Sequence, residues 1–321
     1  MAKNIDNLAV LLLIFNRPEL TQQVFEVIKK VKPSRLFISA DGPRVDNSDD
    51  LILCQKTRDI VKQVDWECDV VTFFRKKNLG CRLAISSGIS WFFEHVDEGV
   101  ILEDDCLPSE SFFSFSQNLL NKYRFDNRIM QINGGYHLKN IASFSESYYF
   151  SKLNSCWGWA TWKRAWKYFD SDMTGYLDSK KNKSIINYYQ NKEIASWMIS
   201  YFEEANHPSC NIWSTQWSYA IFKNDGLCIN PTSNLVNNIG FLDSPTSGVH
   251  ESFLSYSEHI LEDIETIISP SEVVYDLNND ILEFNNVIKL TDPRLLNQGF
   301  FKNFKLIFKR GFNFIVRRIG Y

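Results

Sequence analysis

The stretch Gly99-Val100-Ile101-Leu102-Glu103-Asp104-Asp105 joins a short hydrophobic run to three consecutive acids. A run of this length is too short for a helix and is typical of a buried strand. The segment that starts at Pro108 predicts a helix, for which Ser109 is a plausible cap. The three acids therefore come at the carboxyl end of a core strand, where open α/β sheets place their ligands.

Adjacent carboxylates repel one another, and each raises the pKa of its neighbours. A divalent cation with oxygen ligands is the usual remedy, and Mg²⁺ or Mn²⁺ in such a place also holds a phosphate group. A solvated acidic turn is the alternative, because acids also stabilise the N-terminus of a following helix. The motif alone leaves both interpretations open.

The segments before this strand alternate between apolar runs and helical patterns. Residues 8–15 are a near-continuous apolar run, typical of a buried parallel strand, and Pro18 suits the first turn of the next helix. Residues 35–40 and 69–75 predict the second and third strands, with a helix at 49–64 between them. Four strand–helix units in about a hundred residues predict an α/β fold with a doubly wound parallel sheet.

Size and composition are those of an ordinary soluble globular protein. The chain has 321 residues, of which 44% are hydrophobic and 23% charged, and its formal net charge is −3. This length suits one large domain or a domain with an appendage, and the charge favours no nucleic-acid partner. Neither a dinucleotide-type glycine fingerprint after the first strand nor a P-loop sequence occurs.

The seven cysteines are scattered and include no CxxC pair. This pattern is typical of reduced thiols in the cytosol and argues against a disulfide framework or a zinc site. The longest N-terminal apolar run, residues 8–15, is too short to cross a bilayer and is not a convincing signal peptide. We therefore expect a cytoplasmic protein.

Two more side chains are expected beside the acids. Arg17 follows the first strand and Asp41 the second, and parallel strands end at one sheet edge. An arginine there can pair with phosphate through its forked guanidinium, and an aspartate can accept hydrogen bonds from a ribose or a base. Each also has a local explanation, as a surface ion pair or as a side chain bonded to its own turn. Together they indicate a nucleotide site.

The chain resembles the GT-A superfamily of nucleotide-sugar-dependent glycosyltransferases, and within it the bacterial nucleotide-diphospho-sugar transferase group related to N-acetylglucosaminyltransferase I. The matching segments follow the family order over three quarters of the chain, and they are Ile14 to Pro18, Ser39 to Gly42, Asn78 to Arg82, Val100 to Ser109, Cys156 to Trp162, Trp213 to Trp217, Asn234 to Phe241 and Gly248 to His250. The resemblance implies a mostly parallel central sheet with helices on both faces, plus a C-terminal helical tail.

The implied organisation is a GT-A catalytic domain at residues 1–250, with a nucleotide-binding half at 1–125 and an acceptor-binding half at 126–250, and a helical extension at 251–321. The implied activity is metal-dependent transfer of a sugar from a nucleotide diphosphate donor, with a UDP-sugar favoured, to a hydroxyl of a glycan or lipid-linked glycan in surface polysaccharide synthesis. Inversion is the expected outcome. The alternatives are a nucleotide-sugar-binding protein with weak or no transferase activity and, with less support, a sugar nucleotidyltransferase.

The resemblance also implies roles for single residues. Asp105, the last acid of a variant DxD motif, is expected to bind Mn²⁺ or Mg²⁺, and His250 is expected to approach the metal unless it is only a loop histidine. Asp104 is expected near the ribose or metal waters, with Glu103 orienting the cluster. The other implied donor-site residues are Phe15, Asn16, Arg17, Asp41, Arg82, Trp157 and Trp159. Trp157 and Trp159 are either sugar platforms or core residues, whereas Trp162 and Trp166 are assigned to the core.

The catalytic base does not follow the family pattern. An inverting transferase needs a carboxylate near the acceptor hydroxyl. Relatives carry an aspartate where this chain has Ser214, which is followed by Thr215 and Gln216. Hydroxyl and amide side chains cannot take up a proton near neutral pH. Either Asp243 on the following loop supplies the base or the activity is weak, different or absent; Ser214 and Gln216 stay candidate catalytic residues.

Two segments have their own charge pattern. Residues 178–192 carry four lysines and are expected to form a solvated, mobile connection. Residues 301–321 contain six Lys or Arg and no acid, and Phe and Ile side chains recur along one helical stripe. This pattern favours a helix on an anionic membrane surface through residues 300–321, which would make the protein peripheral. A helix docked on the catalytic domain is the alternative.

Overall fold

The computed structural model describes residues 7–139, 141–181, 183–207, 209–240, 260–292 and 294–295. The strands of its main sheet are β1 (Ala9–Ile14), β2 (Arg35–Ala40), β3 (Asp69–Phe74), β4 (Glu98–Glu103), β6 (Ile129–Asn133), β7 (Tyr148–Ser151), β8 (Trp159–Trp162) and β9 (Leu227–Pro231). Their order is β3-β2-β1-β4-β8-β6-β9-β7. A second, two-stranded sheet pairs β5 (Cys106–Pro108) with β10 (Val236–Asn238).

Pairing in the main sheet is mostly parallel. Strand β1 lies between β2 and β4, parallel to both, β3 is parallel to β2, and β6 is parallel to β9. Strand β8 runs antiparallel between β4 and β6, and β7 is antiparallel to β9 at the edge. The predicted α/β class with a mostly parallel central sheet is therefore confirmed.

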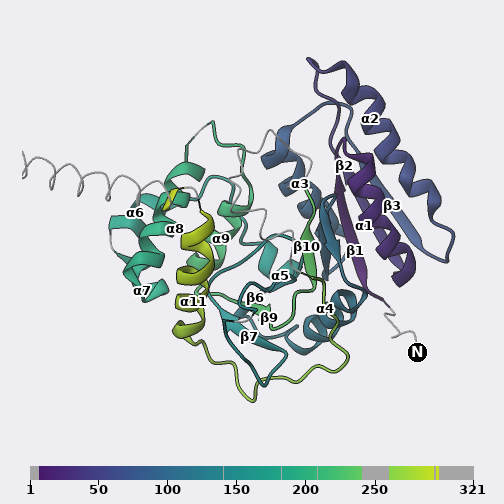
Figure 1. The fold of residues 1–321 in the computed structure, drawn as a ribbon. Helices are drawn as coiled ribbons and strands as arrows, with labels where there is room; N and C mark the ends of the chain where they lie inside the picture. Colours follow the sequence, from purple (N-terminus) through teal and green to yellow (C-terminus); the bar gives the residue numbers. More distant parts are fainter. Residues whose placement is uncertain are drawn as a thin grey trace, which may run out of the picture.

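The helices lie on both faces of this sheet. They are α1 (Pro18–Val31), α2 (Ser48–Asp59), α3 (Gly80–His95), α4 (Glu110–Lys122), α5 (Lys163–Trp166), α6 (Tyr176–Lys181), α7 (Ser184–Tyr189), α8 (Lys192–Ala205), α9 (Ser214–Lys223), α11 (Leu277–Glu283) and α12 (Lys289–Thr291), with a 3₁₀ turn at Ile60–Gln63 and a π-helical turn at Phe284–Ile288. Figure 1 shows α1 and α2 beside β1 to β3 at one end of the molecule, and α6 to α8 at the other.

Strand β1 shows why both faces are covered. Val10 and Leu12 point into a core that includes Phe25 of α1, while Leu11 and Leu13 point into a second core that includes Phe92 of α3. Helices pack on both faces of this strand, so both faces need apolar side chains. A continuous apolar run supplies them, whereas a strand that alternates with polar residues would not. Burying one such leucine contributes about 2 kcal/mol.

The predicted elements of the first hundred residues agree closely with the structure. The strands predicted at 8–15 and 69–75 are each one residue shorter at one or both ends, and the strand at 35–40 is unchanged. Ser109 holds the N-cap position of α4, but its hydroxyl contacts Ser111 Oγ at 3.0 Å and caps no N–H.

The prediction of a solvated, mobile connection at 178–192 is wrong. This segment forms α7 and parts of its neighbours, and Ile185, Tyr188 and Tyr189 are buried. They share a core with Phe202 of α8 and with Phe284. The lysines are exposed on the outside of a packed helical layer, so charge alone was a poor guide there.

The chain returns to the sheet after residue 260. The backbone N–H of Glu262 donates to the carbonyl of Asn234 at 2.8 Å, and Tyr275 forms a bridge to Phe150 of β7. Helix α11 then packs beside α8 and α9 (Figure 1). Asp243, His250, the domain boundary at 250 and the stripe at 300–321 lie outside the described residues. No helix in the described part of the chain is long and apolar enough to cross a membrane. All seven cysteines are free thiols.

Candidate functional site

The three acids leave β4 and meet Arg17, which lies between the end of β1 and the start of α1. Arg17 Nη1 lies 2.9 Å from Asp105 Oδ2, and its Nη2 forms an ion pair with Asp104 Oδ1. The backbone N–H of Phe15 also donates to Asp104. The side chain of Asp104 is 4% exposed and that of Arg17 38%, so the guanidinium covers the acids on the solvent side.

The charges of this group are only partly balanced. Burial raises the pKa of Glu103 to about 8, and the carboxylates of Asp105 and Asp104 add to that rise. Burial also raises the pKa of Asp104 to about 6, although Arg17 opposes the shift. Burial lowers the pKa of Arg17, but the two aspartates outweigh it and hold the pKa above its usual range. Three acids share one guanidinium, which leaves the edge attractive to a further cation.

The strand β10 closes over Asp105 from the other side. The backbone N–H of Ile239 donates to the carbonyl of Asp105 at 2.8 Å. A Cβ on Gly240 would lie 2.3 Å from Asp105 Oδ2, so only glycine allows this approach. Asp105 is thus held between the β1 edge and the segment that ends at Gly240.

Asp41 lies at the same sheet edge, and its carboxylate is occupied by hydrogen bonds within the protein. It is 7% exposed, and its carboxylate accepts from the N–H groups of Gly42 at 2.8 Å and Leu79 at 3.0 Å. The N–H of Gly80 and the side chain of Asn78 donate to it as well, at 3.1 and 2.9 Å. These bonds satisfy N–H groups that the start of α3 leaves unpaired. Only the bond from Gly42 belongs to the turn of Asp41 itself, and the other donors come from the loop before α3 and from the first residue of that helix. The base-binding role remains a prediction.

Beside Arg17 lies a cluster that the sequence analysis missed. Asp50 is completely buried and accepts from Arg44 Nε at 2.6 Å and Nη2 at 2.9 Å, and from Asn16 Nδ2 at 2.8 Å. The hydrogen bonds from Arg44 lower the pKa of Asp50 to about 2. The guanidinium of Arg44 lies 5.4 Å from the centre of the Phe15 ring. The only sequence signal was an acid in the first turn of a helix after an Asp-Gly-Pro-Arg turn.

Arg82 takes no part in this group by any contact in the described chain. Its side chain donates to the carbonyls of Ser171 and, at 3.4 Å, Cys210, while its backbone N–H donates to Asn211 Oδ1 at 3.1 Å. It ties the start of α3 to two loops of the second half of the chain. Its donor-site role stays a prediction.

The tryptophans divide between core and surface. Trp159 is completely buried and stacks on Trp213 with ring centroids 5.9 Å apart, so its platform role is corrected to a core role. Trp162 and Trp166 are buried as well. Trp157 is partly exposed and meets His137 edge to face at 6.2 Å, so the platform alternative applies to Trp157 alone.

The two candidates on α9 also separate. Ser214 begins the helix and lines a cavity. Gln216 is completely buried, and its Nε2 donates to the carbonyl of Ala205 at 3.4 Å. With no surface open to a ligand, Gln216 is a packing residue between α8 and α9, and its assignment to catalysis is corrected.

The cavity reached by Ser214 has a volume of about 280 Å³. It opens between the loop before β8, helices α8 and α9, and residues 283–292. Its wall combines aromatic, amide, hydroxyl and acidic groups, among them Asn154, Trp157, Trp197, Tyr201, Ser214, Ser218, Glu283 and Asp292. Sequence reasoning missed both acids, because the burial of Glu283 and Asp292 depends on contacts with residues far away in the chain.

The acids at β4 fit a metal bound together with a phosphate. In the described residues no group of three or more His, Cys, Asp or Glu is placed to hold a metal ion. Mg²⁺ commonly needs only one or two protein carboxylates when phosphates and waters complete its shell. Asp104 and Asp105 present two carboxylates at one point, which suits that mode once Arg17 turns toward a phosphate.

No family profile matches the chain, and no curated protein sequence matches it. Several solved structures share parts of its course. A 4-diphosphocytidyl-2C-methyl-D-erythritol synthase from Anaerococcus prevotii has a TM-score of 0.35 and 9% identity, over 70% of this chain and 90% of that one. A cytidylyltransferase from Leptospira borgpetersenii has a TM-score of 0.31 and 12% identity, over 52% of this chain and 64% of that one. A UDP-glucose pyrophosphorylase in complex with UDP-glucose has a TM-score of 0.28 and 13% identity, over 50% of this chain and 70% of that one. At such scores these likenesses carry no conclusion about the activity of this chain.

Proposed function

We propose that this protein is a metal-dependent glycosyltransferase that moves a sugar from a nucleotide diphosphate donor, with a UDP-sugar favoured, to a hydroxyl of a glycan or lipid-linked glycan. The observation that carries the proposal is the meeting of Arg17, Asp104 and Asp105 at the carboxyl edge of the parallel strands. An open α/β sheet binds its ligand at that edge.

Arg17 is the phosphate-binding residue in this proposal. Its side chain is 38% exposed, and its guanidinium can exchange a carboxylate for a phosphate without changing its forked geometry. Asp105 and Asp104 then become available to Mn²⁺ or Mg²⁺, which when bound neutralises charge on a departing nucleoside diphosphate. Glu103, next to them in the chain, orients the two aspartates in this proposal; with its pKa raised to about 8 it is largely protonated near neutral pH and adds little repulsion.

The nearby Asn16–Arg44–Asp50 cluster supports a nucleotide at this edge. Asp50 holds the Arg44 guanidinium in place through two side-chain hydrogen bonds, and Arg44 covers Phe15. A flat aromatic ring with a fixed cation beside it provides a stacking surface for a base. Asp41 keeps the adjoining turn rigid through its bonds to Leu79 and Gly80.

A panel of UDP-, GDP- and other nucleotide sugars tests the proposal, with binding and hydrolysis measured in the presence and absence of Mn²⁺. We expect metal-dependent binding of at least one donor. Binding without turnover would favour the nucleotide-sugar-binding alternative, to which Ser214 in place of an aspartate adds weight. Formation of a nucleoside triphosphate on addition of pyrophosphate would favour a nucleotidyltransferase.

The basic, aromatic stripe at residues 300–321 adds a proposal about location. Insertion of its Phe side chains into the membrane, together with about 1 kcal/mol per Lys or Arg near the surface, would hold the protein peripherally on an anionic membrane. Truncation near Gly299 should remove sedimentation with anionic liposomes and leave nucleotide binding unchanged. A full-length chain that shows no preference for anionic over neutral liposomes at low salt would contradict this proposal.

A further inference from the structure

The cavity beside α11 has the chemistry of a sugar-binding pocket. Partly exposed rings of Trp157, Trp197 and Tyr201 face it, together with amide and hydroxyl groups. A pyranose needs both kinds of surface, because its C–H face packs on aromatic rings and its hydroxyls need hydrogen-bond partners. A volume of about 280 Å³ is large enough for one pyranose ring.

The aromatic wall is fixed in place before any ligand binds. Asp292 is 3% exposed, and its Oδ2 accepts from Trp197 Nε1 at 2.8 Å and from the Tyr201 hydroxyl at 2.6 Å. The two rings meet edge to face with centroids 5.1 Å apart. A rigid wall lowers the entropy lost on binding.

Glu283 faces the same cavity with little to hold it. It is 9% exposed, and the hydrogen bond to its Oε2 from Asn230 Nδ2 is long, at 3.5 Å. Its neighbour one helical turn earlier, Asp280, is also buried but accepts from Ser151 Oγ at 2.6 Å, Lys152 N–H at 3.1 Å and Tyr275 hydroxyl at 3.0 Å. The protein therefore supplies Asp280 with its hydrogen-bond donors, whereas it gives Glu283 only one distant donor.

No cation in the described chain forms an ion pair with Glu283. The ammonium of Lys152, which also lines the cavity, donates to the carbonyl of Tyr188 and lies 4.5 Å and 4.4 Å from the ring centres of Tyr188 and Tyr275. A buried carboxyl group that is held by one long hydrogen bond is unfavourable, most of all when it ionises. Ligand hydroxyls would supply the missing donors.

The cavity also lies near the proposed donor site. Cys156 and Trp157 belong to its wall, and Trp157 comes two residues before Trp159 of β8. Trp159 pairs with Ile101 of β4, which comes two residues before Glu103 on the antiparallel strand. One end of the cavity therefore lies next to the acids at the end of β4.

We propose that this cavity is the acceptor subsite, that it takes one pyranose ring, and that Glu283 accepts hydrogen bonds from the hydroxyls of that ring. The proposal rests on the glycosyltransferase function proposed above. It places residues 283–292, which belong to the expected C-terminal extension, inside the acceptor site.

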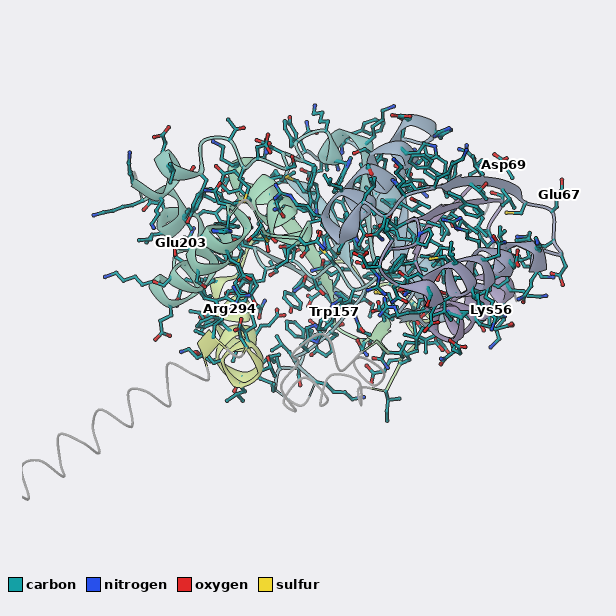
Figure 2. All side chains as sticks on the ribbon, turned by 90° about the horizontal axis from the view of Figure 1, so that it is seen from above. Lys56, Glu67, Asp69, Trp157, Glu203 and Arg294 are labelled. Atoms are coloured by element: carbon teal, nitrogen blue, oxygen red, sulfur yellow. The ribbon has the colours of Figure 1, made fainter. Side chains whose placement is uncertain are left out.

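The test is saturation-transfer difference NMR with the methyl pyranosides of glucose, galactose, mannose, N-acetylglucosamine and N-acetylgalactosamine. At about pH 9, above the pKa of about 8 to which burial raises Glu283, Glu283→Gln keeps the side-chain volume and removes the charge, and we expect it to weaken binding of the preferred pyranoside about tenfold or more. The control is Glu203→Gln, on the exposed side of α8, apart from Trp157 in Figure 2. This control should bind as the parent protein does.

Two results would overturn the proposal: no binding of any of these pyranosides at millimolar concentration, or equal binding by the Glu283→Gln and parent proteins. Calorimetry of UDP with Mn²⁺ on the same samples distinguishes a change in pyranoside binding from a change at the donor site. Glu283→Gln should leave that affinity unchanged. Absence of UDP binding to the parent protein would contradict the proposed function while a positive sugar result still stood.

Discussion

Two groups of acids, the partly buried triplet Glu103-Asp104-Asp105 at the end of β4 and the buried pair Asp280 and Glu283 on α11, are stabilised in different ways. The triplet is covered by the guanidinium of Arg17, which pairs with two of its three members. The pair has no such cation among the described residues; Asp280 accepts three good hydrogen bonds, and Glu283 accepts one long one.

The difference in their partners distinguishes acids that stabilise the fold from acids that are available to a ligand. An acid saturated by donors, such as Asp280, is a structural residue. An acid held by a partly exposed cation can exchange it, which is what a site for a metal and a phosphate requires. Glu283 has neither arrangement, and burial raises its pKa to about 8, with Asp280 adding to the rise.

The largest effect expected is at the triplet. Asp105→Ala should lower Mn²⁺-dependent affinity for UDP at least a hundredfold, about 2.7 kcal/mol or more, because it removes the carboxylate best placed for the metal. The thermal midpoint should change little, since Asp105 lies at a strand end. Calorimetry measures the affinity, and Asp59→Ala, on the exposed side of α2, is the control. Unchanged affinity for UDP and Mn²⁺ would remove Asp105 from the site.

Removing Asp280 should damage the fold instead. Asp280→Ala leaves the donors of Ser151, Lys152 and Tyr275 buried and unpaired, so we expect a loss of about 2–3 kcal/mol in the free energy of unfolding. Urea denaturation measures this loss. If Asp280→Ala and Glu283→Ala destabilised the protein equally, the distinction between the two acids would fail.

Glu283→Gln, unlike Asp280→Ala, should raise the free energy of unfolding, and the gain should depend on pH. The pKa of Glu283 is raised from 4.5 to about 8 in the folded state, so the folded protein loses stability as pH rises through that window. The glutamine in Glu283→Gln cannot ionise, so this variant does not lose stability over that pH range. Relative to the parent it should therefore gain about 1–2 kcal/mol above about pH 8, and nothing below about pH 4.5. Urea denaturation across this range measures the difference; a gain that did not change with pH would contradict it.

The smallest effect expected concerns the cation that distinguishes the two groups. Arg17→Lys keeps the charge but loses the fork that spans Asp104 and Asp105. We expect about a tenfold loss of UDP affinity, near 1.4 kcal/mol, with the metal requirement retained. Titration of UDP at fixed Mn²⁺ measures it. A lysine variant that bound UDP as tightly as the parent would assign the phosphate contact to another residue.

The first half of the fold could be predicted because its signals are local. Residues 8–15 are apolar throughout since β1 is buried on both faces, and Pro18 marks where the helix begins. The acids, Arg17 and Asp41 share one edge because parallel strands must end together. Which hydrogen bonds Asp41 makes was not predictable, because Asn78 and Leu79 come from another loop.

The second half could not be predicted in the same way. Strands β7 and β8 have four residues each, too few for a clear periodicity. Glu283 follows an Asn- and Asp-rich segment that resembles a solvated helix in sequence. It is buried only because Asn230 and the cavity wall come from distant parts of the chain. Contacts over such separations leave no local pattern.

The most direct test of the proposed activity is ³¹P NMR of the protein with diamagnetic Mg²⁺ and the nucleotide sugar that it binds. The account predicts that the donor signals decline and free nucleoside diphosphate appears, only with the metal, and not in Asp105→Ala. Appearance of nucleoside triphosphate and sugar 1-phosphate on addition of pyrophosphate would contradict it, as would a bound nucleotide sugar that stays intact whatever acceptor sugar is added.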